Sequence, residues 1–257
     1  GADATIECPA SPTFTAPTAS DLCNGATVSI VGADVTGGNS CVRTYTRTWR
    51  AVDGCGNSSV TRSQTITRVD LTAPTIGSAG ADATIECTAS PAFTAPTASD
   101  LCNGATVQII SPDISSGNSC LRTVTRTWLA VDGCGNSSAT RNQTITIRDI
   151  TPPVIGNPTN VTIECPASPT FTAPTASDAC NGATVVQSGS DATGGNSCVQ
   201  TVTRTWYAID ACGNTSATRS QTITIRDITA PTIGSAGAAA TIECPASPTF
   251  TPPTASD

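Results

Sequence analysis

The sequence predicts an all-β chain built from tandem β-sandwich repeats of about 79 residues. The phrase TIEC occurs four times, ending at Cys8, Cys87, Cys165 and Cys244, so the period is 79, 78 and 79 residues. Threonine supplies 46 of the 257 residues, and a β-branched chain punctuated by glycine and proline favours strands. No segment shows the apolar period of a helix. Because self-similarity at a fixed period marks a repeat protein, the period defines the domains.

The period divides the chain into three nearly complete repeats and the first part of a fourth. The phrases TRTW and CGN recur in each of the first three blocks. We therefore expect β-sandwich repeats at residues 1–71, 72–150 and 151–228, and an incomplete repeat at residues 229–257.

Each repeat is expected to consist of short strands separated by turns. In the first repeat, an apolar segment at Ala4–Cys8 comes first, and a β-branched run follows at Ala26–Val31. A glycine-rich turn at Gly37–Asn39 leads into the longest strand, Val42–Val52. After a turn that contains CGN, the segment Val60–Val69 should return antiparallel to it. Turns about ten residues apart with strands between them are typical of a sandwich.

Alternation along the longest strand identifies the face that points to the core. Tyr45, Arg47, Trp49 and Ala51 share one side, and a ladder of threonines occupies the other. The tryptophan marks the core, and the threonines mark a solvated or laterally packed face. Arg47 on the inner face could form an anion site. We favour an arginine stem packed over the indole of Trp49, with its charged head at the rim.

The thirteen cysteines divide into four per repeat plus Cys244. This density is typical of an oxidised extracellular domain. Zinc is disfavoured because the chain has no C-x-x-C pair and no histidine. With one tryptophan and one phenylalanine in each complete repeat, the core is small. Disulfides would therefore supply much of the stability.

Strand geometry ranks the three pairings that four cysteines allow. Cys41 and Cys55 bracket a strand of eleven residues, which spans about 36 Å, whereas a disulfide needs Cα atoms within about 7 Å. In an immunoglobulin-like sandwich, Cys8 and Cys41 would lie at one end and Cys23 with Cys55 at the other. We expect pairs within each repeat, and Cys244 unpaired or paired outside the chain. The expected disulfides are Cys8–Cys41, Cys23–Cys55, Cys87–Cys120, Cys102–Cys134, Cys165–Cys198 and Cys180–Cys212.

The linkers between repeats have nearly constant length and sequence, as in Asp70-Leu71-Thr72-Ala73-Pro74. Proline stiffens each junction, and a constant linker gives a constant rotation from one repeat to the next. We expect the repeats to form a linear rod.

Aspartates near each junction are the candidate metal ligands. Three carboxylates that converge there would suit calcium, which prefers oxygen ligands. The alternative is that each aspartate only caps its own turn. We expect no cofactor other than this calcium. The two candidate sets are Asp70, Asp100 and Asp132, and Asp149, Asp178 and Asp210.

Composition disfavours several classes of function. The net charge is −7, from 12 arginines against 19 acidic residues, so a nucleic acid or an anionic membrane is not expected as a partner. No apolar run reaches transmembrane length, so we expect no membrane insertion within this segment. Without histidine, lysine or a paired-carboxylate motif, and with every candidate acid recurring in each repeat, the chain is not expected to be an enzyme.

The motif TRTWxAxDxCGNxSxTxxQTIT, followed by a D-x-T-x-P linker, resembles the hyalin-repeat-like, immunoglobulin-like modules of large bacterial surface proteins. The resemblance implies an extracellular or cell-surface adhesin, stalk or matrix role and assigns no catalytic residue. Typical hyalin repeats place their cysteines differently, so the pairing above rests on geometry alone.

We expect a structural filament or stalk whose partners are like repeats, either adjoining in one long chain or associating end to end or laterally. The alternative is an adhesin that binds a glycan or a protein through loops at the sandwich ends.

Two features leave alternatives open. Residues 229–257 are expected either to be the start of a longer array or to donate a strand to a neighbouring subunit. Sugar attachment is the second open feature, because five Asn-x-Ser/Thr sites are present. These candidate glycosylation sites are Asn57, Asn136, Asn142, Asn160 and Asn214.

Overall fold

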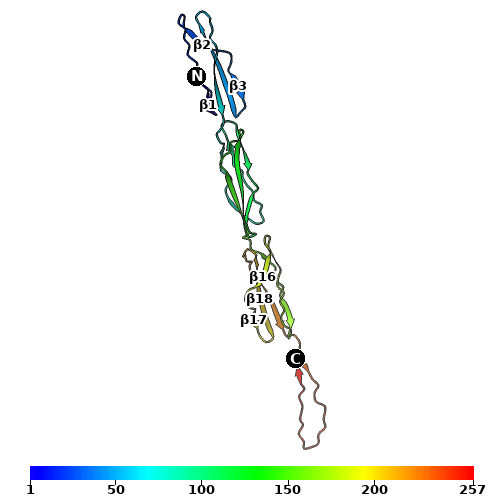
Figure 1. Ribbon diagram of the computed structural model, residues 1–257. Helices are drawn as coiled ribbons and strands as arrows, with labels where there is room; N and C mark the ends of the chain where they lie inside the picture. The colour runs from blue at the N-terminus through cyan, green and yellow to red at the C-terminus, as the bar shows by residue number, and fades with distance from the viewer. The chain divides into compact units, whose positions relative to one another are not determined.

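The computed structural model describes residues 1–257 and is all-β, which confirms the predicted fold class (Figure 1). It divides into two compact units, Gly1–Asp149 and Ile150–Asp257. The first unit holds the first two repeats, and the second holds the third repeat and the incomplete fourth. Each complete repeat contains one five-stranded sheet. The predicted blocks 1–71, 72–150 and 151–228 each enclose one such sheet, while independent folding of each block stays a prediction.

The first unit contains two five-stranded sheets and one two-stranded sheet. The first sheet consists of β1 (Ala4–Glu7), β2 (Ala26–Ile30), β3 (Val35–Gly38), β4 (Val42–Asp53) and β5 (Arg62–Val69). The second consists of β7 (Ala83–Glu86), β9 (Ala105–Ile109), β10 (Ile114–Gly117), β11 (Leu121–Asp132) and β12 (Arg141–Arg148). The short strands β6 (Thr75–Ile76) and β8 (Ala98–Ser99) form the two-stranded sheet.

The second unit contains one five-stranded sheet and two two-stranded sheets. Its five-stranded sheet consists of β14 (Val161–Glu164), β16 (Ala183–Gln187), β17 (Ala192–Gly195), β18 (Val199–Asp210) and β19 (Arg219–Arg226). Its two-stranded sheets pair β13 (Val154–Ile155) with β15 (Ala176–Ser177), and β20 (Thr232–Ile233) with β21 (Ala255–Ser256).

In the first sheet, the strand order places β5 between β1 and β4. Strand β1 runs parallel to β5, and β4 runs antiparallel to it, with Val69 opposite both Glu7 and Val42. The other edge of β4 is shared by β3 and β2, which pair with different halves of this long strand. The antiparallel return that we expected from Val60–Val69 is confirmed.

The sequence pattern did not predict β3, because its two glycines indicated only a turn. It forms a tight hairpin with β4, in which Asn39 N donates to Val42 O at 2.9 Å. Gly38 has a positive φ of 85°, and a Cβ there would overlap the carbonyl oxygen of Val42. Glycine is therefore required by the close approach of the two strands as well as by the turn.

The linker residues after Pro74 supply a strand to the second repeat. Thr75 lies opposite Ser99, and Ile76 lies opposite Ala98. The hydroxyl of Thr75 also donates to the carbonyl oxygen of Ser99 at 2.9 Å. The linker is therefore hydrogen-bonded to the repeat that follows it.

The predicted core face is confirmed in the second repeat. Val124, Trp128 and Ala130 of β11 are all buried. The ring of Phe93 meets the indole of Trp128 edge to face, with 6.3 Å between centroids. On the opposite face, the hydroxyls of Thr125 and Thr144 are 3.0 Å apart and hydrogen-bonded across neighbouring strands. The threonine ladder thus contributes cross-strand contacts on the outer side.

A buried glutamine attaches the irregular proline-rich segment to each sheet. Gln143 is only 4% exposed. Its Oε1 accepts from Thr94 N at 2.8 Å, and its Nε2 donates to Ala81 O at 2.8 Å. Gln64 and Gln221 make the corresponding bonds in the other two complete repeats. Each buried glutamine thus satisfies backbone groups that have no strand partner.

The fourth TIEC segment forms no strand, unlike the first three. Strands β1, β7 and β14 each pair with the last long strand of their repeat, and the fourth repeat has no such strand within these 257 residues. The segment after β19 therefore runs out and back as an exposed hairpin, closed by β20 and β21 (Figure 1). In all three complete repeats the last long strand is already paired on both edges, so the position that this segment would take beside it is filled, and strand donation to a neighbouring subunit stays a prediction.

We predict that Gln143→Leu destabilises the first unit by about 2–4 kcal/mol, because a backbone N–H and a C=O lose their buried partner. Equilibrium unfolding in guanidinium chloride, monitored by tryptophan fluorescence, measures the change. The matched control is Gln108→Leu, since Gln108 is exposed on β9. We expect the control to shift stability by no more than about 0.5 kcal/mol. Equal effects of the two substitutions would contradict the assigned role.

Candidate functional site

The candidate site is the junction between the first and second repeats, where two disulfides cross from one repeat to the next. Cys8 bonds to Cys102, with 6.0 Å between Cα atoms, and Cys41 bonds to Cys134, with 5.4 Å between Cα atoms. Cys8 follows β1 and Cys41 precedes β4, so both lie at one end of the first sheet. Cys102 and Cys134 lie in the two end loops of the second repeat that flank β9 and β11. The facing ends of two repeats are therefore joined covalently at two points.

The predicted pairing within each repeat is wrong at this junction. Neither Cys8–Cys41 nor Cys102–Cys134 forms, since each of these four cysteines bonds across the junction. The predicted pairs Cys23–Cys55 and Cys165–Cys198 do not form either, because all four residues are free, as is Cys244. Cys87, Cys120, Cys180 and Cys212 are disulfide-bonded.

Strand order explains the correction. Cys8 N donates to Val69 O, and Asp70 N donates to Cys41 O, so the end of β5 lies between the two cysteines. Strands two places apart in a sheet are about 10 Å apart, which is beyond the reach of a disulfide. Cys87 and Cys120 are separated in the same way by β12, which disfavours the predicted pair Cys87–Cys120. The predicted pairing of Cys180 with Cys212 stays a prediction.

Asp70 links the two repeats through its side chain and its backbone. It is 4% exposed. Its Oδ2 accepts from Asn103 Nδ2 at 2.6 Å, and its carbonyl oxygen accepts from Asn136 Nδ2 at 3.2 Å. Both asparagines belong to the end loops of the second repeat. The other carboxylate oxygen, Oδ1, is buried and has no hydrogen-bond partner.

The structure brings two of the three predicted calcium ligands of this junction together. Ligand atoms of Asp70, Asp100 and Cys102 lie within 4.8 Å of one another. Cys102 cannot act as a thiolate ligand, because its sulfur is in the disulfide with Cys8. The two carboxylates, one of them with an unpartnered buried oxygen, form an acidic position of the kind that oxygen-preferring cations bind.

Asp132, the third predicted ligand, instead caps its own turn. Its Oδ1 accepts from Cys134 N and Asn136 N at 2.8 and 2.9 Å, and its Oδ2 accepts from Asn136 Nδ2 at 2.8 Å. Burial alone would raise the pKa of Asp132, but these hydrogen bonds outweigh it and lower the pKa below its ordinary value. In the second predicted set, Asp210 is held in the same way by Asn214 and Cys212. Calcium binding by Asp149, Asp178 and Asp210 stays a prediction.

A cavity of about 380 Å³ lies beside the Cys8–Cys102 disulfide. Its walls come from the linker at Thr72, Ala73 and Thr75, and from the end loop at residues 99–102. Its volume is within the range of small-molecule binding sites.

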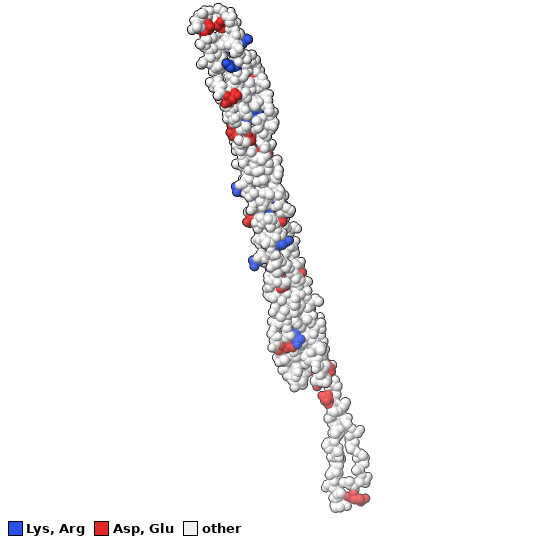
Figure 2. Space-filling view, in the orientation of Figure 1, with Lys and Arg blue, Asp and Glu red and all other residues white.

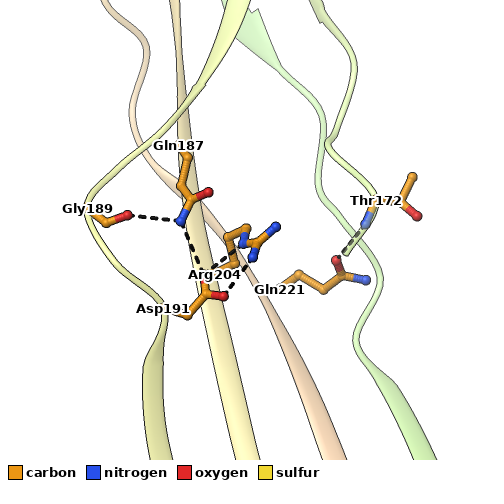
Figure 3. A network of polar contacts seen from close by, with 6 residues as sticks. All are labelled: Thr172, Gln187, Gly189, Asp191, Arg204 and Gln221. Carbon is orange, nitrogen blue, oxygen red and sulfur yellow. Dashed lines mark hydrogen bonds and ion pairs between the residues drawn. The ribbon is translucent and has the colours of Figure 1, made fainter. Parts of the chain in front are cut away.

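Each complete repeat also contains an arginine whose charge is neutralised inside the same repeat. In the third repeat, Arg204 Nε and Nη2 donate to Asp191 Oδ1 and Oδ2, both at 2.7 Å (Figure 3). Gln187 Nε2 donates to Gly189 O and Asp191 Oδ1, which holds the loop that carries the aspartate (Figure 3). The hydrogen bonds from Arg204 lower the pKa of Asp191, and burial, which would raise it, is the smaller effect.

The interpretation of Arg47 is corrected in one respect. Its guanidinium lies 4.3 Å from the ring centroid of Phe14 and pairs with Asp34, whereas we expected it to pack over Trp49. Phe14 lies between them, since its ring meets the Trp49 indole edge to face at 6.2 Å. Because Asp34 occupies the guanidinium, the structure supports our preference for a packing role over an anion site.

The surface offers little charge to a partner. Charged side chains are sparse on the face in Figure 2, and arginines there are scattered and do not form a broad patch. The structure has no helix with the length and hydropathy needed to cross a bilayer.

The five sugar-attachment candidates stay predictions, and the structure distinguishes among them. The side-chain amide of Asn136 donates to Asp132 and to Asp70 O, so a sugar there would disturb the junction. The amides of Asn57 and Asn214 donate to Asp53 and Asp210. Asn142 lies exposed on β12, which makes it the most accessible of the candidates on this repeat.

Comparison with known proteins gives one family match, which covers part of the chain. The HYR-like domain with four cysteines matches residues 153–225, which lie in the third repeat. The extracellular domain of protocadherin gamma B4 is 15% identical, with a TM-score of 0.31 over 90% of this chain and 50% of that chain. The first three extracellular domains of Drosophila N-cadherin are 11% identical, with a TM-score of 0.34 over 89% of this chain and 99% of that chain. Both structural likenesses are distant, and neither bears on function. No match was found among curated proteins.

We predict that non-reducing peptide mapping of the oxidised chain recovers Cys8 linked to Cys102 and Cys41 linked to Cys134. The reason is that β5 separates Cys8 from Cys41 while the junction brings each of them to a cysteine of the next repeat. Mapping after alkylation at low pH, which blocks exchange, makes the measurement. Recovery of a Cys8–Cys41 peptide would show that the junction is not covalent.

A second prediction concerns pH. Hydrogen bonds from Arg126 lower the pKa of Asp113, and burial, which raises it, is the smaller effect. A carboxyl whose pKa is lower in the folded state stabilises that state above the unfolded pKa and loses this effect as the pH falls. We expect the melting temperature of the wild type to hold near neutral pH and to fall below about pH 4. Asp113→Asn should melt lower at pH 7 and lose less between pH 5 and pH 2. Asp257→Asn, at an exposed position, is the control and should follow the wild type.

Proposed function

Because the chain is built from hyalin-repeat-like modules, which are extracellular domains, we propose that it is a structural stalk whose repeats are locked together by disulfides across their junctions. The third repeat carries the family match, and the other repeats share its TRTW, CGN and TIEC phrases. The observation that carries the proposal is the pair of disulfides between the first two repeats. The family match supports a structural class of function. The two disulfides support a mechanism by which neighbouring repeats are held rigidly together.

Two bonds at separate points restrain a joint more than one bond does. A single disulfide would leave the second repeat free to pivot about it. The two bonds attach to different strands of the first sheet, one after β1 and one before β4, so bending and twisting are both opposed. The cysteines they join are 94 and 93 residues apart. In the chain-entropy model, one loop of this length contributes on the order of 4–5 kcal/mol.

The linker at this joint is also held by side chains. Glu7 Oε1 accepts from Leu71 N at 2.8 Å and from the Thr72 hydroxyl at 2.9 Å. Pro74 follows, and Thr75 and Ile76 then pair as β6. Since the linker is fixed to the repeat on each side of it, little of it is left to flex.

The same contacts disfavour adhesion through the end loops of the second repeat. Asp100, Cys102 and Asn103 are partly buried, and Asp132 is buried, because the first repeat covers the end on which they lie. Loops that are used to join repeats are not free to bind a glycan or a protein. An adhesive role would have to use another surface of the repeat.

Calcium would add to the stiffness at the same place. Asp70 and Asp100 are the residues that would hold it, since the buried Asp70 Oδ1 lacks a partner and the Asp100 carboxylate is close to it. A bound cation would neutralise the two facing carboxylates and tie an end loop of the second repeat to the end of β5.

We predict that the junction disulfides, and not the linker alone, fix the orientation of the first two repeats. Residual dipolar couplings of residues 4–148 should fit one alignment tensor in the oxidised wild type. The variant with Cys8, Cys41, Cys102 and Cys134 all replaced by serine should stay folded and need two tensors. The control is Cys23→Ser/Cys55→Ser, which also removes cysteines but leaves the junction intact, and should still fit one tensor. A single tensor for the four-serine variant would assign the stiffness to the linker.

We also predict that calcium raises the melting temperature of the oxidised chain and that Asp70→Asn removes this increase. The readout is the difference with and without calcium, so any loss of stability from the substitution itself cancels. Asp257→Asn, which is exposed and remote in sequence from the junction, should keep the full increase. An unchanged melting temperature of the wild type in EDTA and in millimolar calcium would end the calcium proposal and leave the stalk proposal intact.

A further inference from the structure

Four of the free cysteines correspond to the halves of the junction already described. Cys23 and Cys55 are exposed and free in the first repeat. One period later in the sequence, Cys102 and Cys134 occupy the same positions and are bonded to the preceding repeat. Cys165 and Cys198 are also exposed and free, and they correspond to Cys8 and Cys41, which are bonded to the following repeat.

The end loops of the first repeat already have the geometry of the bonded ones. Asp21 Oδ2 accepts from Cys23 N at 3.1 Å, and Asp53 Oδ1 accepts from Cys55 N at 2.9 Å. The bonded loops show the same contacts, at 2.8 Å from Cys102 N to Asp100 and at 2.8 Å from Cys134 N to Asp132. Asn24 Nδ2 lies 3.1 Å from Cys55 Sγ, and its counterpart Asn103 Nδ2 lies 3.0 Å from Cys134 Sγ. The loops that carry Cys23 and Cys55 therefore share the hydrogen bonds of the loops whose cysteines are bonded.

The end of the third repeat that carries Cys165 and Cys198 has the same backbone contacts as the end of the first repeat that carries Cys8 and Cys41. Cys165 N donates to Arg226 O at 3.3 Å, as Cys8 N donates to Val69 O at 2.8 Å. Asp227 N donates to Cys198 O at 3.2 Å, as Asp70 N donates to Cys41 O at 3.0 Å. Strand β19 lies between Cys165 and Cys198, so they cannot reach each other, for the reason given for Cys8 and Cys41.

We propose that these two ends recognise each other between copies, with Cys23 and Cys55 of one chain bonding to Cys165 and Cys198 of a second copy. This inference rests on the proposed function, because it extends the same covalent junction from repeats within a chain to repeats of separate chains. The product is a head-to-tail covalent polymer with two disulfides at every contact. An interface of this kind joins unlike ends, so it grows into a filament and does not close as a dimer.

Polar contacts at the interface follow from the first junction. There, Asn103 donates to the Asp70 carboxylate and Asn136 donates to the Asp70 carbonyl oxygen. Their counterparts are Asn24 and Asn57 on one copy and Asp227 on the other, and all three are exposed in the single chain. Docking would bury them in the arrangement that Asp70 shows.

Each bond requires an oxidant, which we take to be a small-molecule disulfide such as glutathione disulfide. One thiolate attacks the oxidant and forms a mixed disulfide, releasing one glutathione. The thiolate of the second copy then attacks the protein sulfur of that bond and releases the second glutathione. Two thiols have lost two protons and two electrons, and the oxidant has become two thiols.

Cys244 has to be removed from any test of this pairing. Residues 237–257 repeat residues 1–21 with two differences, Ala239 in place of Asp3 and Pro252 in place of Ala16. Cys244 is therefore the counterpart of Cys8, and it is free and exposed. Within 257 residues it lacks a companion that corresponds to Cys41, so it could form one bond but not the double junction.

The experiment uses two variants of the 257-residue chain, both carrying Cys244→Ser. The first also carries Cys23→Ser and Cys55→Ser, and the second also carries Cys165→Ser and Cys198→Ser. Each is incubated alone and as a mixture in a glutathione redox buffer, and products are resolved on non-reducing gels. We expect each variant alone to stay monomeric, the mixture to give covalent dimers and no larger species, and Cys244→Ser by itself to give a ladder. Peptide mapping of the dimer should recover Cys23–Cys165 and Cys55–Cys198.

Other outcomes overturn the proposal. Covalent oligomers of either variant alone would show that the thiols pair without regard to end. A monomer in which Cys23 maps to Cys55 would show that this pair closes within its own repeat. Mapping of the Cys8–Cys102 bond in the same samples distinguishes a failure of the polymer proposal from a failure of the stalk proposal. If that bond is present while the mixture stays monomeric, polymerisation fails and the stalk proposal survives, whereas its absence would remove both.

Discussion

The last long strand of each repeat decides how the cysteines can be used. In the first repeat, β5 lies between β1 and β4, and therefore between Cys8 and Cys41. The two thiols at this end are too far apart to bond to each other, so they remain available to another repeat. The end loops of the second repeat present Cys102 and Cys134 to them. The strand order within one sheet thus prevents disulfides inside the repeat at this end. The bonds that were expected to cross-link one repeat instead join two neighbouring repeats.

The small core of each repeat is supported by contacts that do not depend on apolar volume. Phe14 packs between the indole of Trp49 and the guanidinium of Arg47, whose charge is balanced by Asp34. Gln64 supplies hydrogen bonds to the irregular segment that carries this phenylalanine. The same arrangement recurs in the second and third repeats. Each repeat can keep a defined interior with few large side chains, and its cysteines are then free for the junctions.

The proposed stalk would benefit if the core stabilises each repeat and the disulfides hold its junctions. Stiffness in a chain of repeats depends on its joints, because a flexible joint cancels the rigidity of the sheets on either side. At the first joint, two disulfides, the bound linker and the buried Asp70 all act within a few residues. The end loops take part in this joint, and that use competes with ligand binding.

The sequence by itself determined the period, the all-β class, the longest strand and its inner face. Each of these depends on local spacing, as with the alternation that places Trp128 and Ala130 on the buried side of β11. It also placed the cysteines correctly at the two ends of a repeat. It missed β3, because glycine in a strand that makes a close approach looks the same as glycine in a turn.

Only the tertiary structure decided which cysteines meet. Disulfide partners depend on which strand lies between them and on what the neighbouring repeat brings near, and Cys8 and Cys102 are 94 residues apart in the chain. The same holds for Asp70, whose role depends on Asn103 and Asn136 of the next repeat. The residue pattern within one repeat contains no information about contacts between two neighbouring repeats. The junction could therefore be identified only from the tertiary structure.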